Sequence, residues 1–107
     1  MITVDDFAKL EIKIGTIVEA EKVADADRLL KLVFDFGDEK RQIISSIADY
    51  FSPEELVGKQ LPVIVNLEPK KFRGHLSEGM ILAADDGSDG IALLFPHKPV
   101  VPGSRVR

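Results

Sequence analysis

The stretch that decides the fold class is Leu30-Lys31-Leu32-Val33-Phe34-Asp35-Phe36-Gly37-Asp38-Glu39-Lys40-Arg41-Gln42-Ile43-Ile44. Its first half places leucine or phenylalanine at every second position over residues 30–36, which is the period of a strand with one buried face. The turn Gly37-Asp38-Glu39 is short enough for a hairpin, and a further strand is predicted over residues 40–47. The stretch therefore predicts two neighbouring strands that run antiparallel.

The sequence before this hairpin predicts a helical turn followed by a long strand. Thr3 and Asp6 have the spacing of a helix N-cap and its capping-box carboxylate, so a short helix is expected through Lys9. Polar and apolar residues alternate from residue 11, and a β-branched run continues the strand toward residue 23. Gly15 interrupts this strand, which indicates a bulge or a sharp bend of the kind that small barrels need.

The sequence after the hairpin predicts a short helix and three more strands. Ser52-Pro53-Glu54-Glu55 combines an N-cap serine, a proline at the first helical position and a capping-box glutamate, and Gly58 supplies the stop. A helix of about two turns is expected there. Strands are predicted over residues 60–67, 78–85 and 91–95, the last two joined by a turn over residues 86–90. Three prolines then keep the tail extended and outside central ladder positions.

These elements favour an all-β protein of one domain. Short strands at this spacing, with one helix between the third and the fourth, are typical of a small closed antiparallel barrel, although the pattern is also compatible with a β-sandwich. The chain has 107 residues, of which 45% are hydrophobic and 30% charged, so a single domain over residues 1–107 is expected.

The composition also narrows the location and the chemistry. The absence of cysteine removes disulfides, thiolate nucleophiles and cysteine zinc sites, and it is compatible with the cytoplasmic location that we expect. No signal peptide is visible at the N-terminus, and the longest apolar runs are far too short to cross a bilayer, so no membrane partner is expected.

No catalytic or metal-binding set of residues emerges from the sequence. His75 and His97 lie in Gly-rich and Pro-rich loops without a suitably spaced histidine or carboxylate, as solvated histidines do. Asp25 and Asp27 lack the glycine and the distant glutamate of a calcium loop and fit a polar turn. The segment at residues 87–90 is followed by no helix and is flanked by aspartates, so a hairpin turn explains it better than a phosphate loop. We therefore expect a protein that is not an enzyme and that needs no cofactor.

The charge is distributed unevenly. A formal net charge of −4 argues by itself against a nucleic-acid ligand. Acidic residues dominate before residue 40 and again over residues 85–89, whereas residues 66–80 hold Lys70, Lys71 and Arg73 with an aromatic and two glycines. A polyanion responds to the local field of such a patch. This segment is interpreted as a long connection between strands that is suited to phosphates, in which Phe72 either stacks on a base or anchors the loop to the core.

Four pieces of the chain, in order, resemble one family. They are residues 3–15, the acidic turn with its following cation and leucine at residues 24–30, the segment at residues 66–80, and the ending Pro102-Gly103-Ser104-Arg105-Val106. Together they are similar to the tRNA-binding OB-fold domain found at the C-terminus of many methionyl-tRNA synthetases, in free-standing structure-specific tRNA-binding proteins and in the cytokine-like multisynthetase subunit. Four pieces in order across the chain are much more specific than any one of them.

The resemblance implies a fold, a function and a set of binding residues. The fold is a five-stranded Greek-key OB-fold barrel with a short helix between strands three and four and an N-terminal helical turn. The function is non-catalytic binding of tRNA, which raises its local concentration for an aminoacyl-tRNA synthetase. The implied tRNA-binding residues are Arg28, where the family usually has a lysine, Asn66, Arg73, Ser77 and Met80, with Lys70 and Lys71 as phosphate contacts. Ser46 departs from the family, which commonly has glycine or alanine there.

The resemblance also implies partners. These are tRNA, a methionyl-tRNA synthetase catalytic chain and a second copy of this chain, held in relatives by the terminal segments, which here are residues 3–9 and the tail after Phe95. Two alternatives remain open. One is a secretion-type chaperone of the same barrel superfamily that binds unfolded polypeptide, and the other is a pure dimerisation module of a synthetase.

Overall fold

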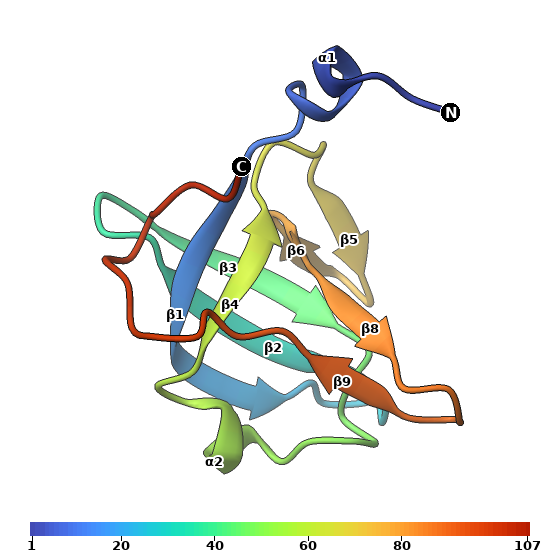
Figure 1. Cartoon of the computed structure of the whole chain (residues 1–107). Coiled ribbons are helices and arrows are strands. Elements are labelled where there is room, and N and C mark those ends of the chain that lie inside the picture. The colour runs from blue at the N-terminus through green and yellow to red at the C-terminus, as the bar shows by residue number, and fades with distance from the viewer.

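Five strands wrap into one antiparallel sheet in the computed structural model, which describes residues 1–107 (Figure 1). Their order in the sheet is β3-β2-β1-β4-β7. The elements in chain order are α1 (Val4–Phe7), β1 (Ile12–Lys22), β2 (Leu30–Asp35), β3 (Lys40–Ser45), α2 (Pro53–Leu56), β4 (Gln60–Ile64), β5 (Lys70–Phe72), β6 (His75–Ser77), β7 (Met80–Ile81), β8 (Ala83–Asp85) and β9 (Ile91–Leu93).

The predicted hairpin is present and begins a Greek key. β2 and β3 pair antiparallel from Leu30↔Ser45 to Asp35↔Lys40, and the Phe36 N–H donates to the Glu39 carbonyl across the turn at 2.8 Å. The chain then crosses through α2, and β4 returns to lie beside β1 rather than beside β3. Three hairpin-connected strands followed by a fourth that pairs with the first form a Greek key. The predicted five-stranded barrel is therefore confirmed.

β1 is shared between the two sides of the barrel. Its first part pairs with β4, from Ile12↔Ile64 to Thr16↔Gln60, and its second part pairs with β2, from Thr16↔Asp35 to Lys22↔Leu30. The register shift lies between Ile17 and Glu19 and not at Gly15, where the sequence indicated a bulge or a sharp bend. Gly15 is required instead for close packing, because a Cβ there would lie 2.7 Å from Cε1 of Phe36 and 2.9 Å from Cδ2 of Phe34.

The C-terminal tail pairs with the first residues of β1, before the point at which β2 begins to pair with that strand. The Ile14 N–H donates to the Ser104 carbonyl at 2.8 Å, and the Ile14 carbonyl accepts from the Gly103 N–H at 2.7 Å. The Val106 N–H donates to the Ile12 carbonyl at 2.8 Å. The prolines before these residues have no N–H to contribute, so the tail pairs with β1 only after Pro102.

Both helices are single turns with the caps that the sequence predicts. Thr3 and Asp6 form a reciprocal capping box, in which the Thr3 hydroxyl accepts from the Asp6 N–H and the Asp6 carboxylate accepts from the Thr3 N–H. At α2 the Glu55 carboxylate accepts from the N–H and the hydroxyl of Ser52. α2 is shorter than the expected two turns because the backbone is already extended at Val57. Neither helix has the length or the apolar character to span a membrane.

The core fills the barrel with the alternate residues of the strands. Phe34, Leu30 and Leu32 of β2 are fully buried, together with Ile43 of β3 and Leu61 of β4. Each such side chain contributes about 1.5–3 kcal/mol when it is removed from water. β3 packs against β6 and β7 on the far side of this core, which closes the sheet into a barrel and excludes the sandwich alternative.

Gly15→Ala is expected to destabilise the barrel by about 1–3 kcal/mol, because the new methyl group overlaps the rings of Phe34 and Phe36. Urea denaturation measures the loss as a lower midpoint at constant slope. Phe36→Leu removes one of the clashing rings, so the same glycine substitution should cost less in that background. An equal cost in both backgrounds would show that the packing explanation is wrong.

Candidate nucleic-acid interface

Residues 66–80 do not form the long loop that the sequence suggested. β5 and β6 pair as a hairpin from Lys70↔Ser77 to Phe72↔His75, so His75 also belongs to a strand and not to a loop. Arg73 and Gly74 are the two central residues of its turn, with φ of +52° and +83°. A two-residue turn with positive φ at both positions is of the primed type that matches strand twist. The turn was missed because arginine is an unusual residue for such a position.

The predicted strand over residues 78–85 is divided into β7 and β8, because Leu82 lies outside both and its N–H donates to the Pro62 carbonyl. The strand predicted over residues 60–67 ends at Ile64. The polar turn at residues 86–90 is present as expected, with the Asp86 N–H donating to the Gly90 carbonyl at 3.2 Å.

The hairpin is held on the barrel by a seam between β3 and β6. The hydroxyl of Ser77 accepts from the Ile44 N–H at 3.0 Å and donates to the Gly79 carbonyl at 3.1 Å. The Glu78 N–H donates to the Gln42 carbonyl at 2.9 Å, and the Gln42 side-chain amide donates to the Leu76 carbonyl at 2.9 Å. Ser77 is only 4% exposed and its hydroxyl both accepts and donates a hydrogen bond within the seam, so its place in the structure is that of a seam residue.

Arg41 reinforces this seam from inside the barrel wall. Its Nη1 donates to the carbonyls of Val65 and Glu78, and its Nε donates to the Glu39 carboxylate at 2.8 Å. One guanidinium thus joins β3 to the residue that follows β4 and to the residue that follows β6. These three bonds occupy Arg41, so this cation differs from the exposed ones on the hairpin.

An open groove runs between the hairpin and the turn after β1, and we name it the arginine groove. It has a volume of about 660 Å³ and is lined by polar or aromatic residues with Ala26 and Leu29 beneath them. Those residues are Asp27, Arg28, Ser46, Lys71, Phe72 and Arg73. Three predicted binding residues, Arg28, Lys71 and Arg73, therefore meet on one surface although Arg28 lies far from the others in sequence.

Phe72 anchors the hairpin and also borders the groove. Its ring is half-buried against a small cluster of Val23, Ala26 and Ile44. The ammonium group of Lys70 lies 5.1 Å from the centroid of the same ring, within the range of a cation–π interaction. The anchoring interpretation of Phe72 is thus confirmed, and the ring at the same time forms one wall of the groove.

Arg28 projects into solvent at the other wall. Its side chain is 82% exposed, and its Nε lies 3.5 Å from the Asp49 carboxylate. An exposed ion pair of this kind contributes at most about 1 kcal/mol, so a phosphate can compete for the guanidinium. No ion pair involves Lys71 or Arg73.

The remaining predicted residues lie outside the arginine groove. Asn66 is exposed, but its side-chain amide accepts from the Glu11 N–H at 2.8 Å and donates to the Lys9 carbonyl at 2.7 Å, which fastens the chain after α1 to the end of β4. Met80 lies on β7 and is 49% exposed, so its thioether is open to solvent.

Two groove residues, Asp27 and Ser46, were not selected from the sequence as binding residues. The register of β2 against β3 would have predicted their position. Because Leu30 is opposite Ser45, the residues that precede β2 and follow β3 meet at the same end of the hairpin. A hydroxyl and a carboxylate beside three cations offer hydrogen-bond partners for base edges and 2′-hydroxyls.

The carboxyl groups with shifted pKa values lie away from this groove. The pKa of Glu21 is lowered mainly by its hydrogen bond to Lys31, at 2.7 Å, and the pKa of Asp86 is lowered by hydrogen bonds from the side chain and backbone of Ser88. The pKa of Asp6 is lowered first by the Thr3 N–H. A lowered pKa keeps a carboxylate ionised at neutral pH.

The chain is similar to proteins of one family. A family model described as a putative tRNA binding domain matches residues 12–105. The methionine–tRNA ligases of Parabacteroides distasonis and Archaeoglobus fulgidus are each 51% identical over 99% and 98% of the chain, which spans only 16% of either ligase. Among solved structures, a MetRS-related protein from Pyrococcus horikoshii has a TM-score of 0.95 at 41% identity, covering 100% of this chain and 98% of that one. The chaperone CsaA of Bacillus anthracis has a TM-score of 0.91 at 30% identity, covering 100% and 99%.

Ser77→Ala is expected to lower the free energy of unfolding by about 1–3 kcal/mol, because it leaves the buried N–H of Ile44 without an acceptor. Chemical denaturation measures this loss. Ser46→Ala, which removes an exposed hydroxyl that makes no hydrogen bond, is the matched control and should change stability by about 0.5 kcal/mol or less. Equal stability of the two variants would contradict the assignment of Ser77 to the seam.

Proposed function

This chain belongs to the putative tRNA-binding domain family, and from that premise we propose that it binds tRNA without chemistry at the arginine groove. In this proposal the bound tRNA is brought close to an aminoacyl-tRNA synthetase, most directly one of the methionyl type. The observation that carries the proposal is the convergence of Arg28, Lys71 and Arg73 on one groove of a chain whose net charge is −4. Cations gathered against the overall charge of a protein favour a polyanionic ligand through their local field.

The proposed contacts are mainly to the RNA backbone. Arginine forks onto phosphate oxygens with two parallel hydrogen bonds, and lysine neutralises phosphate as a point charge. The groove is open to solvent, which suits a folded RNA surface better than a small molecule. Structured RNA is recognised largely through phosphates, 2′-hydroxyls and splayed bases, so we expect weak dependence on sequence.

The seven predicted residues take different parts in this proposal. Arg28, Lys71 and Arg73 contact phosphate in the groove, and Lys70 contacts it from the neighbouring position of the same hairpin. Ser77 and Asn66 support binding indirectly through the hydrogen bonds that position the hairpin and the end of β4. Met80 offers an exposed thioether on β7 for an unstacked base beyond the groove.

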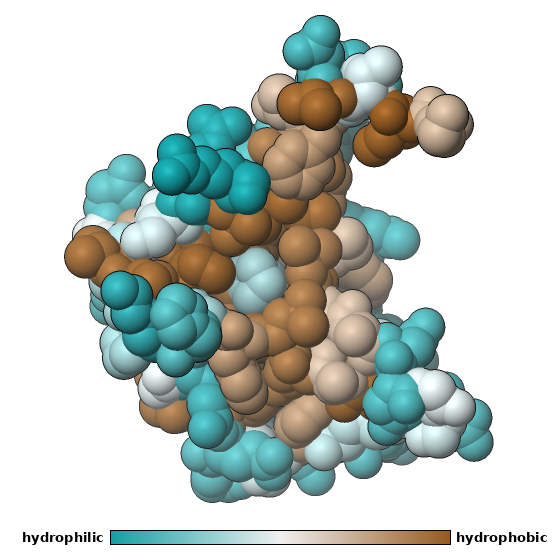
Figure 2. Space-filling model, viewed as in Figure 1, coloured by the Kyte–Doolittle hydropathy of each residue, from teal (hydrophilic) through white to brown (hydrophobic).

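We further propose that two copies of the chain associate and that they act beside a synthetase catalytic chain in the cytoplasm. Figure 2 shows apolar residues on α1, which stands away from the barrel at the top of the view. No residue of α1 is buried, and Ile2, Val4, Phe7 and, in the tail, Val101 are exposed apolar residues. A two-fold dimer through these segments would present two arginine grooves to one RNA, which raises avidity where both are reached together.

The chaperone alternative has support from structural similarity to CsaA. It predicts binding of unfolded polypeptide to apolar surface, and such binding persists at high salt. The arginine groove does not favour it, because cations line both of its walls. A pure dimerisation module, the other alternative, predicts association of two copies without retention of tRNA.

Arg28→Ala and Arg73→Ala are each expected to weaken tRNA binding and to reduce the slope of log K against log salt by about 0.7–0.9. Filter binding of bulk tRNA at two salt concentrations measures both quantities. Lys40→Ala removes an exposed cation at the opposite end of β3 from Ser46 and should keep the wild-type slope. If the wild-type chain retains no tRNA in a salt-sensitive manner, the proposal fails.

Phe7→Ser is expected to raise the dimer dissociation constant by about tenfold or more, since each apolar side chain removed from an interface costs about 1.5–3 kcal/mol. Sedimentation equilibrium measures this constant. The barrel should remain folded because α1 contributes no buried residue. Val57→Ser changes an exposed apolar residue next to α2 and serves as the control. A wild-type chain that stays monomeric at all concentrations would rule out the dimer.

A further inference from the structure

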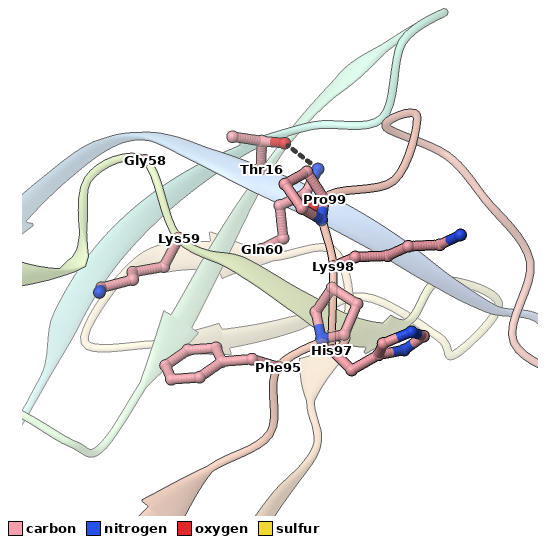
Figure 3. Close-up of a pocket in the computed structure, with 9 residues that line it drawn as sticks. Thr16, Gly58, Lys59, Gln60, Phe95, His97, Lys98 and Pro99 are labelled. Carbon is pink, nitrogen blue, oxygen red and sulfur yellow. Dashed lines mark hydrogen bonds between the residues drawn. The ribbon is translucent and has the colours of Figure 1, made fainter.

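Three aromatic side chains, those of Phe7, Tyr50 and Phe95, are exposed on the barrel. Phe7 lies on α1 and Phe95 at the start of the C-terminal tail, and these are the two segments through which two copies of the chain are proposed to associate. Figure 3 shows that Phe95 extends to one side of the tail and that His97 and Lys98 extend to the other, so these side chains do not form one surface. Tyr50 is the exposed ring that lies outside both segments.

The backbone around Tyr50 is fixed by the core. The N–H groups of Tyr50 and Phe51 both donate to the Ile47 carbonyl, at 3.0 and 3.1 Å. Ile47 is buried, and Phe51 packs against the same core cluster. Tyr50 lies between these two anchors and is still 45% exposed, so the turn holds its ring outside the barrel in a defined place. A ring that is held in this way loses little conformational entropy when a ligand binds.

The turn that carries Tyr50 is joined to the arginine groove through Arg28. The Ala48 N–H donates to the Arg28 carbonyl at 3.1 Å, and the Asp49 carboxylate lies 3.5 Å from the Arg28 Nε. In Figure 1 the turn between β1 and β2 and the segment between β3 and α2 accordingly lie together at the lower edge of the barrel. An RNA strand with a phosphate at Arg28 therefore meets the turn of Tyr50 next.

A hollow of about 230 Å³ lies at this turn and is lined by Lys22, Ala48, Asp49, Tyr50, Phe51 and Ser52. Lys22 is exposed and takes part in no ion pair, and the carboxylate of Asp49 is paired with Arg28. The hollow thus combines a free ammonium group with an exposed aromatic ring. Proteins that bind single-stranded nucleic acids use this combination, because bases stack on the ring while phosphates meet the cation.

Carboxylates limit this surface on the side of α2. A neighbouring hollow shares Lys22 and Ser52 but is also lined by Glu21 and Glu54. Glu21 is paired with Lys31 at 2.7 Å, whereas Glu54, in the first turn of α2, takes part in no ion pair. An unpaired carboxylate repels phosphate, so a strand that leaves the Tyr50 ring is directed toward Arg28 and not toward α2.

From these contacts we infer that Tyr50 and Lys22 form a base-stacking site that continues the arginine groove. An unpaired base of the bound RNA stacks on the Tyr50 ring, with the phosphate on one side of it at Lys22 and the phosphate on the other side at Arg28. The inference rests on the proposed RNA-binding function and adds to it the recognition of one unstacked nucleotide. Because every base has a π-face, the site selects for an unpaired nucleotide and not for a sequence.

The experiment uses the fact that the whole chain contains one tyrosine. Biosynthetic incorporation of fluorotyrosine therefore gives a single fluorine NMR signal, which reports on Tyr50 alone. A single-stranded RNA of four nucleotides should shift this signal. An abasic strand with the same number of phosphates should leave it almost unmoved, because it has no base to stack on the ring.

Variants test the same site with bulk tRNA in filter binding. Tyr50→Leu keeps an apolar side chain but removes the ring, so it should weaken binding by about tenfold without changing the salt slope. Tyr50→Phe keeps the ring and should retain the wild-type affinity. Lys22→Ala should lower the slope of log K against log salt by about 0.7–0.9.

Several outcomes would overturn the inference. If Tyr50→Leu keeps the wild-type affinity and the RNA leaves the fluorine signal unmoved while Arg28→Ala and Arg73→Ala weaken binding, the arginine groove binds tRNA without this site. If Tyr50→Phe weakens binding as much as Tyr50→Leu, the hydroxyl and not the stacked ring makes the contact. If a reduced, unfolded polypeptide shifts the signal and displaces the short RNA at high salt, the hollow is a peptide site. Absence of all tRNA binding by the wild type would refute the proposed function and this inference with it.

Discussion

The seam between β3 and β6 is the constraint on which the rest of the structure depends. The backbone of β6 pairs with β5. The barrel is therefore closed at the seam mainly by side chains, which are the Ser77 hydroxyl, the Gln42 amide and the Arg41 guanidinium. A single backbone hydrogen bond, between Glu78 and Gln42, joins them. A polar group in such a buried seam is costly when it lacks a partner, and no buried side-chain polar atom of the structure does. The seam sets the position of the hairpin and hence of the arginine groove.

An acidic chain can still present a basic surface, because some of its cations are bonded within the fold or paired with carboxylates while others stay exposed and unpaired. Arg41 is used inside the barrel wall, and Lys31 is paired with Glu21 at 2.7 Å. Lys71 and Arg73 take part in no ion pair, and they meet the weakly paired Arg28 at the arginine groove. Net charge describes the field far from the molecule, whereas a bound phosphate is governed by the charges within about one Debye length, or ~10 Å.

Much of the fold follows from local patterns in the sequence. The alternation at residues 30–36, the capping boxes at Thr3 and Ser52, and the turn at residues 86–90 each depend on neighbours within a few positions, and all are present. The arginine groove is harder to predict from such local patterns. The hairpin at β5 and β6 was hidden because its turn contains an arginine at positive φ, which only the surrounding pairing makes tolerable. From the sequence, the hydroxyl of Ser77 suits a ligand as well as it suits a structural hydrogen bond. Only its burial in the folded chain shows that it belongs to the seam.

The sequence by itself determined that the chain is an all-β domain, which family it resembles, and that a cationic segment lies between residues 66 and 80. Each of these depends on short-range periodicity or on motifs that can be seen in order along the chain. The tertiary structure alone decided which cations act together, because Arg28 and Arg73 are far apart in sequence and meet only when the barrel closes. It also decided the course of the C-terminal tail, which is held on the barrel by Gln60 and by pairing with β1. Surfaces assembled by long-range contacts have no local signature, and their chemistry appears only in the folded chain.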